Sequence, residues 1–302
     1  MFYCKINCDT RIALIIFGIV AMFSVASADS LEDSVDLSQY SIEKDIPYGE
    51  DPKQVFDLYI APQLENRLKP DVTIVFSHGG GYYFGDKSYS KEFIQPFLEK
   101  GFDVVNSNYR LGLGVFAANS DLASLLRHLV EERDTYRFAS DRFVLMGFSA
   151  GAQMSANIGF WQNEKDDPFN TPKEADIAAV VNISGPSHNF AEVEQIFLNF
   201  EDEELRELGA AMFPPDASYT KGQIISMVEP FDQFDEDDPP MFLWYGERDV
   251  QVPPSTHRKL LAAIGSESSR HRVIYESEGQ HYPSAVEYAR AVDELINFLG
   301  NL

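Results

Sequence analysis

The sequence predicts an α/β domain built on a mainly parallel sheet with helices on both faces. Short apolar runs typical of buried strands alternate along the chain with segments whose apolar residues recur at helical spacing. The run at residues 143–146 is apolar at every position, as a strand covered on both faces requires. This strand–helix–strand order favours parallel pairing, because each helix returns the chain to the same end of the sheet.

The first half of this alternation ends at a sharp turn around residue 149. A helix is expected at residues 88–100, where Pro96 implies either a kink or a later start. A second helix follows the repeated leucines of residues 122–130, with Ser120 or Asp121 available as its N-terminal cap. The expected strands of this half are residues 55–60, 72–77, 102–106 and 143–146.

The second half of the alternation is interrupted once. Residues 186–238 contain two amphipathic helical segments and are expected to form an insertion over one end of the sheet. Such an insertion can be a lid that forms part of a substrate pocket, or a packing layer without gating, and the sequence leaves both interpretations open. The other strands and helices expected in this half are residues 177–183, 241–245, 255–264, 272–277 and 284–299.

The N-terminal residues have the features of a signal peptide. Lys5 and Arg11 precede an apolar run at residues 12–25, and Ala-Ser-Ala at 26–28 offers the small residues that a signal peptidase needs. We expect cleavage after Ala28 and a secreted or periplasmic protein with no membrane segment left. A membrane anchor is less favoured, because the run is shorter than the ~20 residues of a spanning helix. The expected segments are a signal peptide at 1–28, an acidic arm at 29–53 and one domain at 54–302.

The chain is strongly acidic, with a formal net charge of −24. This charge disfavours binding to nucleic acids and to anionic membrane surfaces, so neither is expected as a partner. An acidic run within residues 232–238 is similar to a calcium site at first, but it lacks the spacing of a calcium-binding loop and ends in two prolines. We interpret it as a solvated surface turn and expect no metal. The sequence makes no prediction of oligomeric state.

Residues 143–153 combine a buried strand, a sharp turn and the start of a helix. At their centre lies Gly147-Phe148-Ser149-Ala150-Gly151, a G-x-S-x-G pattern. In such a turn the serine takes a strained backbone conformation that exposes its hydroxyl, and glycines two residues away avoid collisions with neighbouring backbone. We therefore predict Ser149 as a nucleophile. The amide of Ala150, at the start of the helix, should face whatever Ser149 attacks.

A serine nucleophile needs a base that accepts its proton. His281 lies four residues past the end of the last expected strand, at the edge of the sheet where Ser149 also emerges, and we predict it as this base. The other histidines lie in helices, at the start of a strand or in loops, and we assign no proton transfer to them: His78, His128, His188, His257 and His271.

The base in turn needs an acid that orients it. The strand expected at 241–245 stops at Gly246, and Asp249 projects from the loop that follows. This position meets the requirement for the acid, because it lies at a strand end and between nucleophile and base along the chain. Glu247 is the competitor, but an exposed ion pair with its neighbour Arg248 explains it better. We therefore predict Asp249 as the acid.

Three consecutive glycines follow the strand at 72–77, in His78-Gly79-Gly80-Gly81. Glycines let the backbone turn its N–H groups toward the space that faces Ser149, where they would stabilise an oxyanion. A glycine-rich phosphate loop is the rival interpretation, but it needs a lysine or a G-x-G-x-x-G pattern that leads into a helix. Here Tyr82 and Tyr83 follow instead. We expect these tyrosines and Phe84 to line the acyl or alcohol pocket, with packing at the surface as the open alternative, and we expect His78 to brace the loop.

The four motifs, taken in order, resemble those of the α/β-hydrolase superfamily, specifically of carboxylesterases with an HGGG oxyanion loop. The resemblance spans about residues 45–300. It implies the α/β-hydrolase fold with a helical lid insertion at about 186–238, and the absence of any cofactor. It further implies a catalytic triad of Ser149, Asp249 and His281. The oxyanion hole implied by the resemblance consists of the N–H groups of Gly80, Gly81 and Ala150.

Two positions depart from the hormone-sensitive-lipase-like subgroup of these enzymes. Phe148 occupies a position where that subgroup usually has an acidic residue, and Asp249 follows Gly-Glu-Arg rather than opening an Asp-Pro-Leu run. The chain also resembles the kynurenine-formamidase-like hydrolases, which leaves the substrate class open. We assign Phe148, with Tyr82 and Tyr83, to the substrate pocket.

The sequence therefore predicts a serine hydrolase that cleaves small carboxylic esters through an acyl-enzyme intermediate. The expected partner is a small-molecule ester, and neither a metal nor an organic cofactor is expected. An aryl formamidase or other amide hydrolase with the same triad is the alternative. A non-catalytic binding module is disfavoured, because it would lack a member of the triad and all three are present here.

Overall fold

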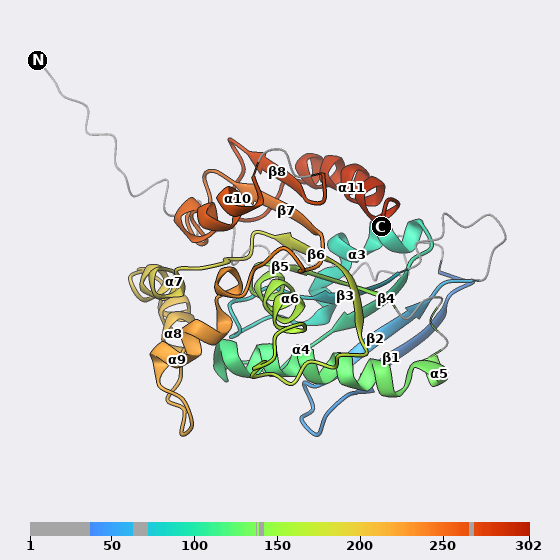
Figure 1. Cartoon of the computed structure of the whole chain (residues 1–302), viewed down its shortest axis with the longest axis horizontal. Coiled ribbons are helices and arrows are strands. Elements are labelled where there is room, and N and C mark those ends of the chain that lie inside the picture. The colour runs from blue at the N-terminus through green and yellow to red at the C-terminus, as the bar shows by residue number, and fades with distance from the viewer. Residues whose placement is uncertain (1–36, 63–71, 137, 139–141, 266–268) are drawn as a thin grey trace, which may run out of the picture. The chain divides into compact units, whose positions relative to one another are not determined.

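The computed structural model of the protein describes residues 37–62, 72–136, 138, 142–265 and 269–302 (Figure 1). The predicted signal peptide, residues 1–28, lies outside the described residues. Within the described ranges, no helix is both long and apolar enough to cross a membrane. The elements below all belong to one compact unit, Leu37–Leu302.

An eight-stranded sheet forms the centre of this unit. Its strands are β1 (Ser41–Pro47), β2 (Val55–Ile60), β3 (Thr73–Ser77), β4 (Asp103–Ser107), β5 (Arg142–Phe148), β6 (Asp176–Ile183), β7 (Met241–Gly246) and β8 (Arg272–Glu276). They lie in the order β1-β2-β4-β3-β5-β6-β7-β8; β2 is antiparallel to both neighbours, and all pairs from β4 to β8 are parallel. Helices cover both faces (Figure 1), so the middle strands are buried and apolar. The predicted mainly parallel α/β fold is confirmed.

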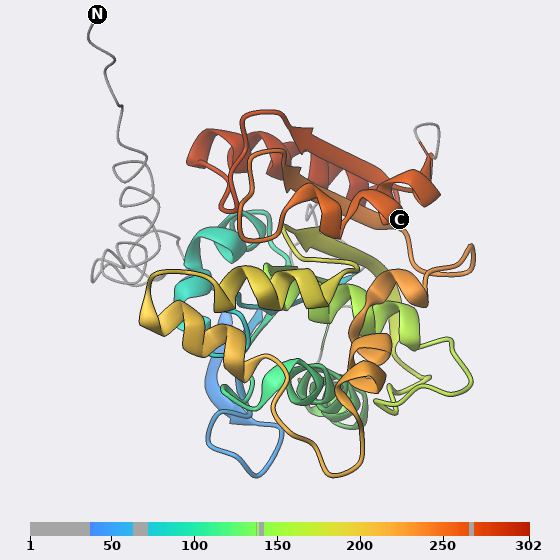
Figure 2. The ribbon, with the colours of Figure 1, turned by 90° about the vertical axis from the view of Figure 1, so that its left-hand side faces the viewer.

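The helices follow the predicted alternation. They are α3 (Lys91–Glu99), α4 (Gly114–Glu131), α5 (Arg133–Tyr136), α6 (Ala150–Trp161), α7 (Phe190–Leu198), α8 (Glu203–Ala211), α9 (Lys221–Val228), α10 (Arg258–Ile264) and α11 (Ala285–Leu299). Helix α3 starts at Lys91, later than predicted, but Pro96 still lies inside it. Helix α6 packs on β5, β6 and α4. Figure 2 shows the insertion helices α7 to α9, in yellow and orange, on the side that faces the viewer.

The sequence predicts an acidic arm at residues 29–53, but residues 41–47 of it form the edge strand β1. Only Ile42 and Ile46 are apolar in this strand before its terminal proline, and most of its side chains are exposed. Backbone hydrogen bonds to β2 hold it in place. A hydrophobic pattern does not reveal such a strand, because it contributes backbone groups rather than apolar side chains to the fold.

The cap predicted for the second helix is wrong. Helix α4 begins at Gly114, before both Ser120 and Asp121. The side chain of Asp121 is fully buried and accepts hydrogen bonds from Arg110, with 2.6 Å between Nη2 and Oδ1. Because burying an unpaired carboxylate is costly, this residue serves a buried ion pair rather than a helix end.

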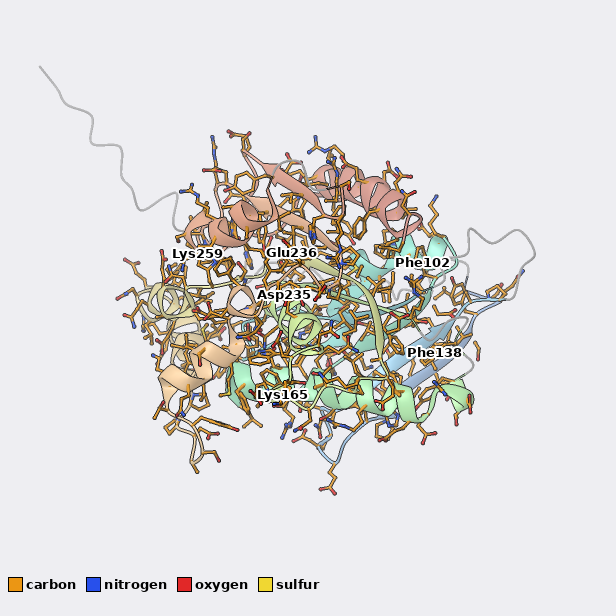
Figure 3. All side chains as sticks on the ribbon, in the orientation of Figure 1. Phe102, Phe138, Lys165, Asp235, Glu236 and Lys259 are labelled. Atoms are coloured by element: carbon orange, nitrogen blue, oxygen red, sulfur yellow. The ribbon has the colours of Figure 1, made fainter. Side chains whose placement is uncertain are left out.

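The acidic turn at residues 232–238 is only partly solvated. Asp235, Glu236 and Asp237 are exposed, as predicted, and Figure 3 labels the first two. Asp238 is buried, with 2% of its surface exposed, and its Oδ2 accepts the backbone N–H of Asp235 at 2.7 Å. Arg270 binds the turn through the carbonyls of Glu236 and Asp238. Burial raises the pKa of Asp238 to about 7.

Asp238→Asn should stabilise the protein more at pH 8 than at pH 5. Since the folded state raises the pKa of this carboxyl above its unfolded value, the stability it contributes is full at low pH and is lost as pH rises through about 7. We expect a gain of about 1 to 3 kcal/mol at pH 8 and a smaller gain at pH 5, because one pKa unit corresponds to about 1.4 kcal/mol. Thermal unfolding at both pH values measures this difference. The exposed neighbour variant Asp237→Asn is the control, and equal shifts for Asp238→Asn at the two pH values would contradict the prediction.

Candidate active site

Ser149 lies at the sharp turn between β5 and α6. Its backbone has φ 53° and ψ −116°, a region that residues other than glycine rarely occupy. Its N–H donates to the carbonyl of Ile183 at 2.8 Å. A Cβ added at Gly147 would lie 2.2 Å from the carbonyl carbon of Gly151, and one added at Gly151 would lie 2.0 Å from the carbonyl oxygen of Ser77. Glycine is therefore required on both sides of the serine, and the predicted turn is confirmed.

The structure places His281 within hydrogen-bond distance of both other residues predicted as a triad. His281 Nε2 lies 2.9 Å from Ser149 Oγ, and His281 Nδ1 lies 2.7 Å from Asp249 Oδ2. The second oxygen of the buried carboxylate, Asp249 Oδ1, accepts the backbone N–H groups of Gln251 at 2.8 Å and Val252 at 2.9 Å. A carboxylate fixed in this way accepts a hydrogen bond from the N–H at Nδ1 of the imidazole. The other nitrogen, Nε2, is then free to accept a proton from the serine.

Glu247, the competing acid, takes no part in this chain of hydrogen bonds. Its carboxylate lies 3.4 Å from Arg258 Nη2 at the protein surface. Arg248, its neighbour along the chain, pairs instead with Glu278 at 2.6 Å. The predicted ion pair between Glu247 and Arg248 is therefore wrong: Glu247 is exposed, but its partner is Arg258 of α10.

The glycine loop after β3 has the backbone conformation that an oxyanion hole requires. Gly80 and Gly81 have φ angles of 115° and 59°. A Cβ added at Gly80 would lie 2.0 Å from the carbonyl oxygen of Phe84, so only glycine fits there. Among the residues that the structure describes, no acceptor receives the backbone N–H groups of Gly80, Gly81 and Ala150. These three donors are therefore available to a ligand.

His78 holds the first residue of this loop. Its Nδ1 lies 2.6 Å from the carbonyl oxygen of Gly79, and its ring stacks on that of Tyr109 with 4.4 Å between centroids. The hydroxyl of Tyr109 donates to the carbonyl of His78 at 3.1 Å. Burial lowers the pKa of His78 to about 4, so the imidazole is neutral at physiological pH. These contacts agree with the predicted bracing role.

The three residues predicted to line the pocket lie in different surroundings. The Phe148 ring lies 5.2 Å from the imidazole of His281, between centroids, and so borders the reacting groups. The hydroxyl of Tyr83 donates to Glu207 of helix α8 at 2.9 Å. The side chain of Tyr82 is buried and its hydroxyl donates to Gln153 Oε1 at 2.9 Å, which favours support of the loop over contact with substrate.

The remaining histidines have structural surroundings. His257 is fully buried and its ring stacks on Tyr245 with 3.8 Å between centroids, and burial lowers its pKa to about 4. The other three lie within hydrogen-bond distance of these neighbours: His128 of Tyr136, His188 of Ser187, and His271 of the backbone N–H of Met241. In the part of the chain that the structure describes, no group of three or more histidine, cysteine, aspartate or glutamate side chains is arranged to hold a metal.

The insertion lies against the glycine loop. A Cβ added at Gly81 would lie 2.4 Å from Leu208 Cδ1 of helix α8. The backbone N–H of Val115, at the start of α4, donates to the carbonyl of Met212 at 3.1 Å. Helix α8 therefore contacts the predicted oxyanion hole directly, which is the position that both a lid and a packing layer would occupy.

Two supporting residues were not predicted. The hydroxyl of Tyr282, directly after His281, donates to Glu92 Oε2 of α3 at 2.6 Å. Gln153 bonds to Tyr82 from inside helix α6. The first contact joins residues that are 190 positions apart, so no local sequence pattern predicts it. The second had a usable signal in the sequence: a glutamine one turn after the predicted nucleophile, where the other residues of the helix are mostly small and apolar.

The fold and this constellation define an α/β-hydrolase. The family model described as BD-FAE matches residues 56–264, more than two thirds of the chain. The protein belongs to this family of α/β-hydrolase-like esterases and is a carboxylic ester hydrolase. Among curated protein sequences, no match was found.

Solved structures of esterases share the fold. Esterase B from Lactobacillus rhamnosis superposes with a TM-score of 0.72 at 17% identity, over 97% of this chain and 95% of that one. The thermophilic esterase 2 of the planctomycete Thermogutta terrifontis has a TM-score of 0.63 at 18% identity, over 87% of this chain and 92% of its own. A bifunctional GH43-CE protein from Bacteroides eggerthii reaches 0.66 at 20% identity; the match covers 86% of this chain but only 35% of that protein.

Proposed function

We propose that the protein cleaves small carboxylic esters through an acyl-enzyme intermediate on Ser149. The observation that carries this proposal is the unbroken chain of hydrogen bonds from Asp249 through His281 to Ser149, at 2.7 and 2.9 Å, beside backbone donors with no protein acceptor among the described residues. Nucleophile, base, acid and oxyanion donors are the parts that acyl transfer needs, and all lie at one edge of the sheet.

In the first half of the reaction, Ser149 Oγ attacks the ester carbonyl carbon while His281 Nε2 takes the hydroxyl proton. Asp249 stabilises the imidazolium that forms. Collapse of the tetrahedral intermediate breaks the bond to the alcohol, which leaves with the proton from Nε2. In the second half, water attacks the acyl carbon while His281 Nε2 takes one of its protons. The bond between the acyl carbon and Ser149 Oγ then breaks, Oγ takes the proton back from Nε2, and the carboxylic acid is released.

The backbone N–H groups of Gly80, Gly81 and Ala150 donate hydrogen bonds to the carbonyl oxygen and stabilise the negative charge that develops on it. These donors are fixed before the reaction, so they cost little reorganisation when the oxyanion forms. The amide of Ala150 also stands at the N-terminus of α6, where the helix dipole favours negative charge. Related chemistry is known for two fold neighbours: esterase B has been solved with a tributyrin phosphonate inhibitor, and the Thermogutta esterase 2 has been solved phosphoramylated by tabun.

The purified protein should hydrolyse p-nitrophenyl acetate or butyrate with a kcat/KM at least about tenfold above that for an aryl formamide, because amide resonance makes the formamide carbonyl less electrophilic. The series acetate, butyrate, octanoate sizes the acyl pocket in the same assay. Ester hydrolysis no faster than in enzyme-free buffer would overturn the proposal. A faster rate on the formamide would replace the ester by an amide as the substrate class.

A further inference from the structure

Three successive residues of the oxyanion loop have positive φ angles: Gly80 at 115°, Gly81 at 59° and Tyr82 at 64°. Glycine adopts this conformation freely, but in a tyrosine it strains the backbone. The strained residue directly follows two predicted oxyanion donors. Contacts of the Tyr82 side chain are therefore needed to keep the loop in this conformation.

Gln153 supplies such a contact. It lies one helical turn after Ser149 in α6 and is fully buried. Its Oε1 accepts hydrogen bonds from the hydroxyl of Tyr82 at 2.9 Å and from Asn119 Nδ2 at 3.1 Å, and its Nε2 donates to the carbonyl of Val228 at 2.7 Å. One side chain thus joins the oxyanion loop, helix α4 and the end of insertion helix α9 to the helix that carries the nucleophile.

The position of this glutamine matters for the chemistry. Its backbone N–H donates to the carbonyl of Ser149 at 3.1 Å, so it belongs to the same helical turn as the nucleophile. The bond from Tyr82 therefore sets the oxyanion loop at a fixed distance from Ser149. An error of about 1 Å in such a distance can cost about a hundredfold in rate.

We propose that Gln153 is a positioning residue for the oxyanion hole, acting through Tyr82. This inference rests on the proposed ester hydrolysis and deepens it: Gln153 aligns the amides of Gly80 and Gly81 with Ser149, and it ties the insertion to that alignment. It touches neither the substrate nor the reacting atoms.

A purely structural role would predict that any buried amide in this network matters equally. Asn157 is the matched comparison, since it lies one turn further along α6 and is also fully buried. Its Nδ2 donates to Asn119 Oδ1 and to the carbonyl of Met227, both at 3.0 Å, and neither bond involves the oxyanion loop. Loss of Asn157 should therefore lower stability without moving the oxyanion donors.

The test measures kcat, KM and unfolding temperature with p-nitrophenyl butyrate for the wild type and for Gln153→Met, Asn157→Leu and Tyr82→Phe. Gln153→Met should lower kcat about ten- to hundredfold while KM changes less than about threefold, because oxyanion contacts act in the transition state. Asn157→Leu should lose comparable stability and keep kcat within about threefold. Tyr82→Phe removes a single oxygen, so it keeps the test available if Gln153→Met does not fold, and it should lower kcat in the same way.

The double variant Tyr82→Phe with Gln153→Met should be hardly worse than Gln153→Met alone, because both changes break the same bond. A kcat of Gln153→Met or Tyr82→Phe within twofold of wild type would overturn the inference, and so would an equal loss of kcat in Asn157→Leu. Those results leave the proposed function intact. If the wild type shows no turnover beyond that of Ser149→Ala, the proposed function fails, and this inference fails with it.

Discussion

Ser149→Ala is expected to lower kcat/KM for p-nitrophenyl butyrate by about 10⁴- to 10⁶-fold, the range seen when the nucleophile of a triad is removed. The change deletes the attacking oxygen and with it the covalent route. The backbone donors of Gly80, Gly81 and Ala150 remain, so a residual rate above that of buffer is compatible with the proposal. Initial rates at several substrate concentrations, with the background subtracted, measure the loss.

A second serine of the same helix serves as the control. Ser155 is buried in α6 like its neighbours, and its hydroxyl donates to the carbonyl of Gly151 at 2.9 Å rather than to any group of the triad. Ser155→Ala should keep kcat/KM within about threefold of wild type, because it removes one local hydrogen bond. An alkyl phosphonate should add its mass to wild type and to Ser155→Ala but not to Ser149→Ala. Labelling of the Ser149→Ala variant would show that the nucleophile is a different residue.

The core of the site could be predicted from the sequence because its signals are local. Ser149 stands between glycines that the turn requires. The consecutive glycines after a strand allow the positive φ angles that Gly80 and Gly81 adopt. His281 and Asp249 each come just after a strand, and parallel strands deliver such residues to one edge of the sheet. Once the alternation of strands and helices is recognised, the position of each residue just after a strand predicts that these residues lie close together.

Three features that escaped prediction depend on partners 11 to 71 positions away in the sequence. Aspartate is a residue type that often caps helices, but in the folded chain the carboxylate of Asp121 accepts hydrogen bonds from Arg110. Asp238 belongs to an acidic run that looks solvated, yet its side chain is buried, and Arg270, about thirty residues later, binds its backbone carbonyl. Tyr82 belongs to the loop by sequence, but its side chain is buried and its hydroxyl donates to Gln153, 71 positions away. Such contacts between side chains cannot be predicted from composition or from the periodicity of apolar residues.

The choice between Asp249 and Glu247 as the acid is decided by a second pair of variants. Asp249→Asn is expected to lower kcat for p-nitrophenyl butyrate by about 10⁴-fold, the loss typical of a triad whose acid becomes an amide. Glu247→Gln should leave kcat within about threefold of wild type, because its carboxylate is exposed and pairs with Arg258 at 3.4 Å. Loss of activity in Glu247→Gln with a normal rate in Asp249→Asn would assign the acid to Glu247.

The size of the expected loss follows from the surroundings of Asp249. Its Oδ1 accepts two backbone N–H groups, from Gln251 and Val252, and only an oxygen can take that place. In Asp249→Asn the amide oxygen must therefore occupy the Oδ1 position, so the amide NH₂ faces His281 Nδ1. That nitrogen then has to accept instead of donate, and the imidazole proton moves to Nε2, against the hydroxyl of Ser149. The base would hold a proton where it needs a lone pair, while the fold and the three side-chain positions stay as they are.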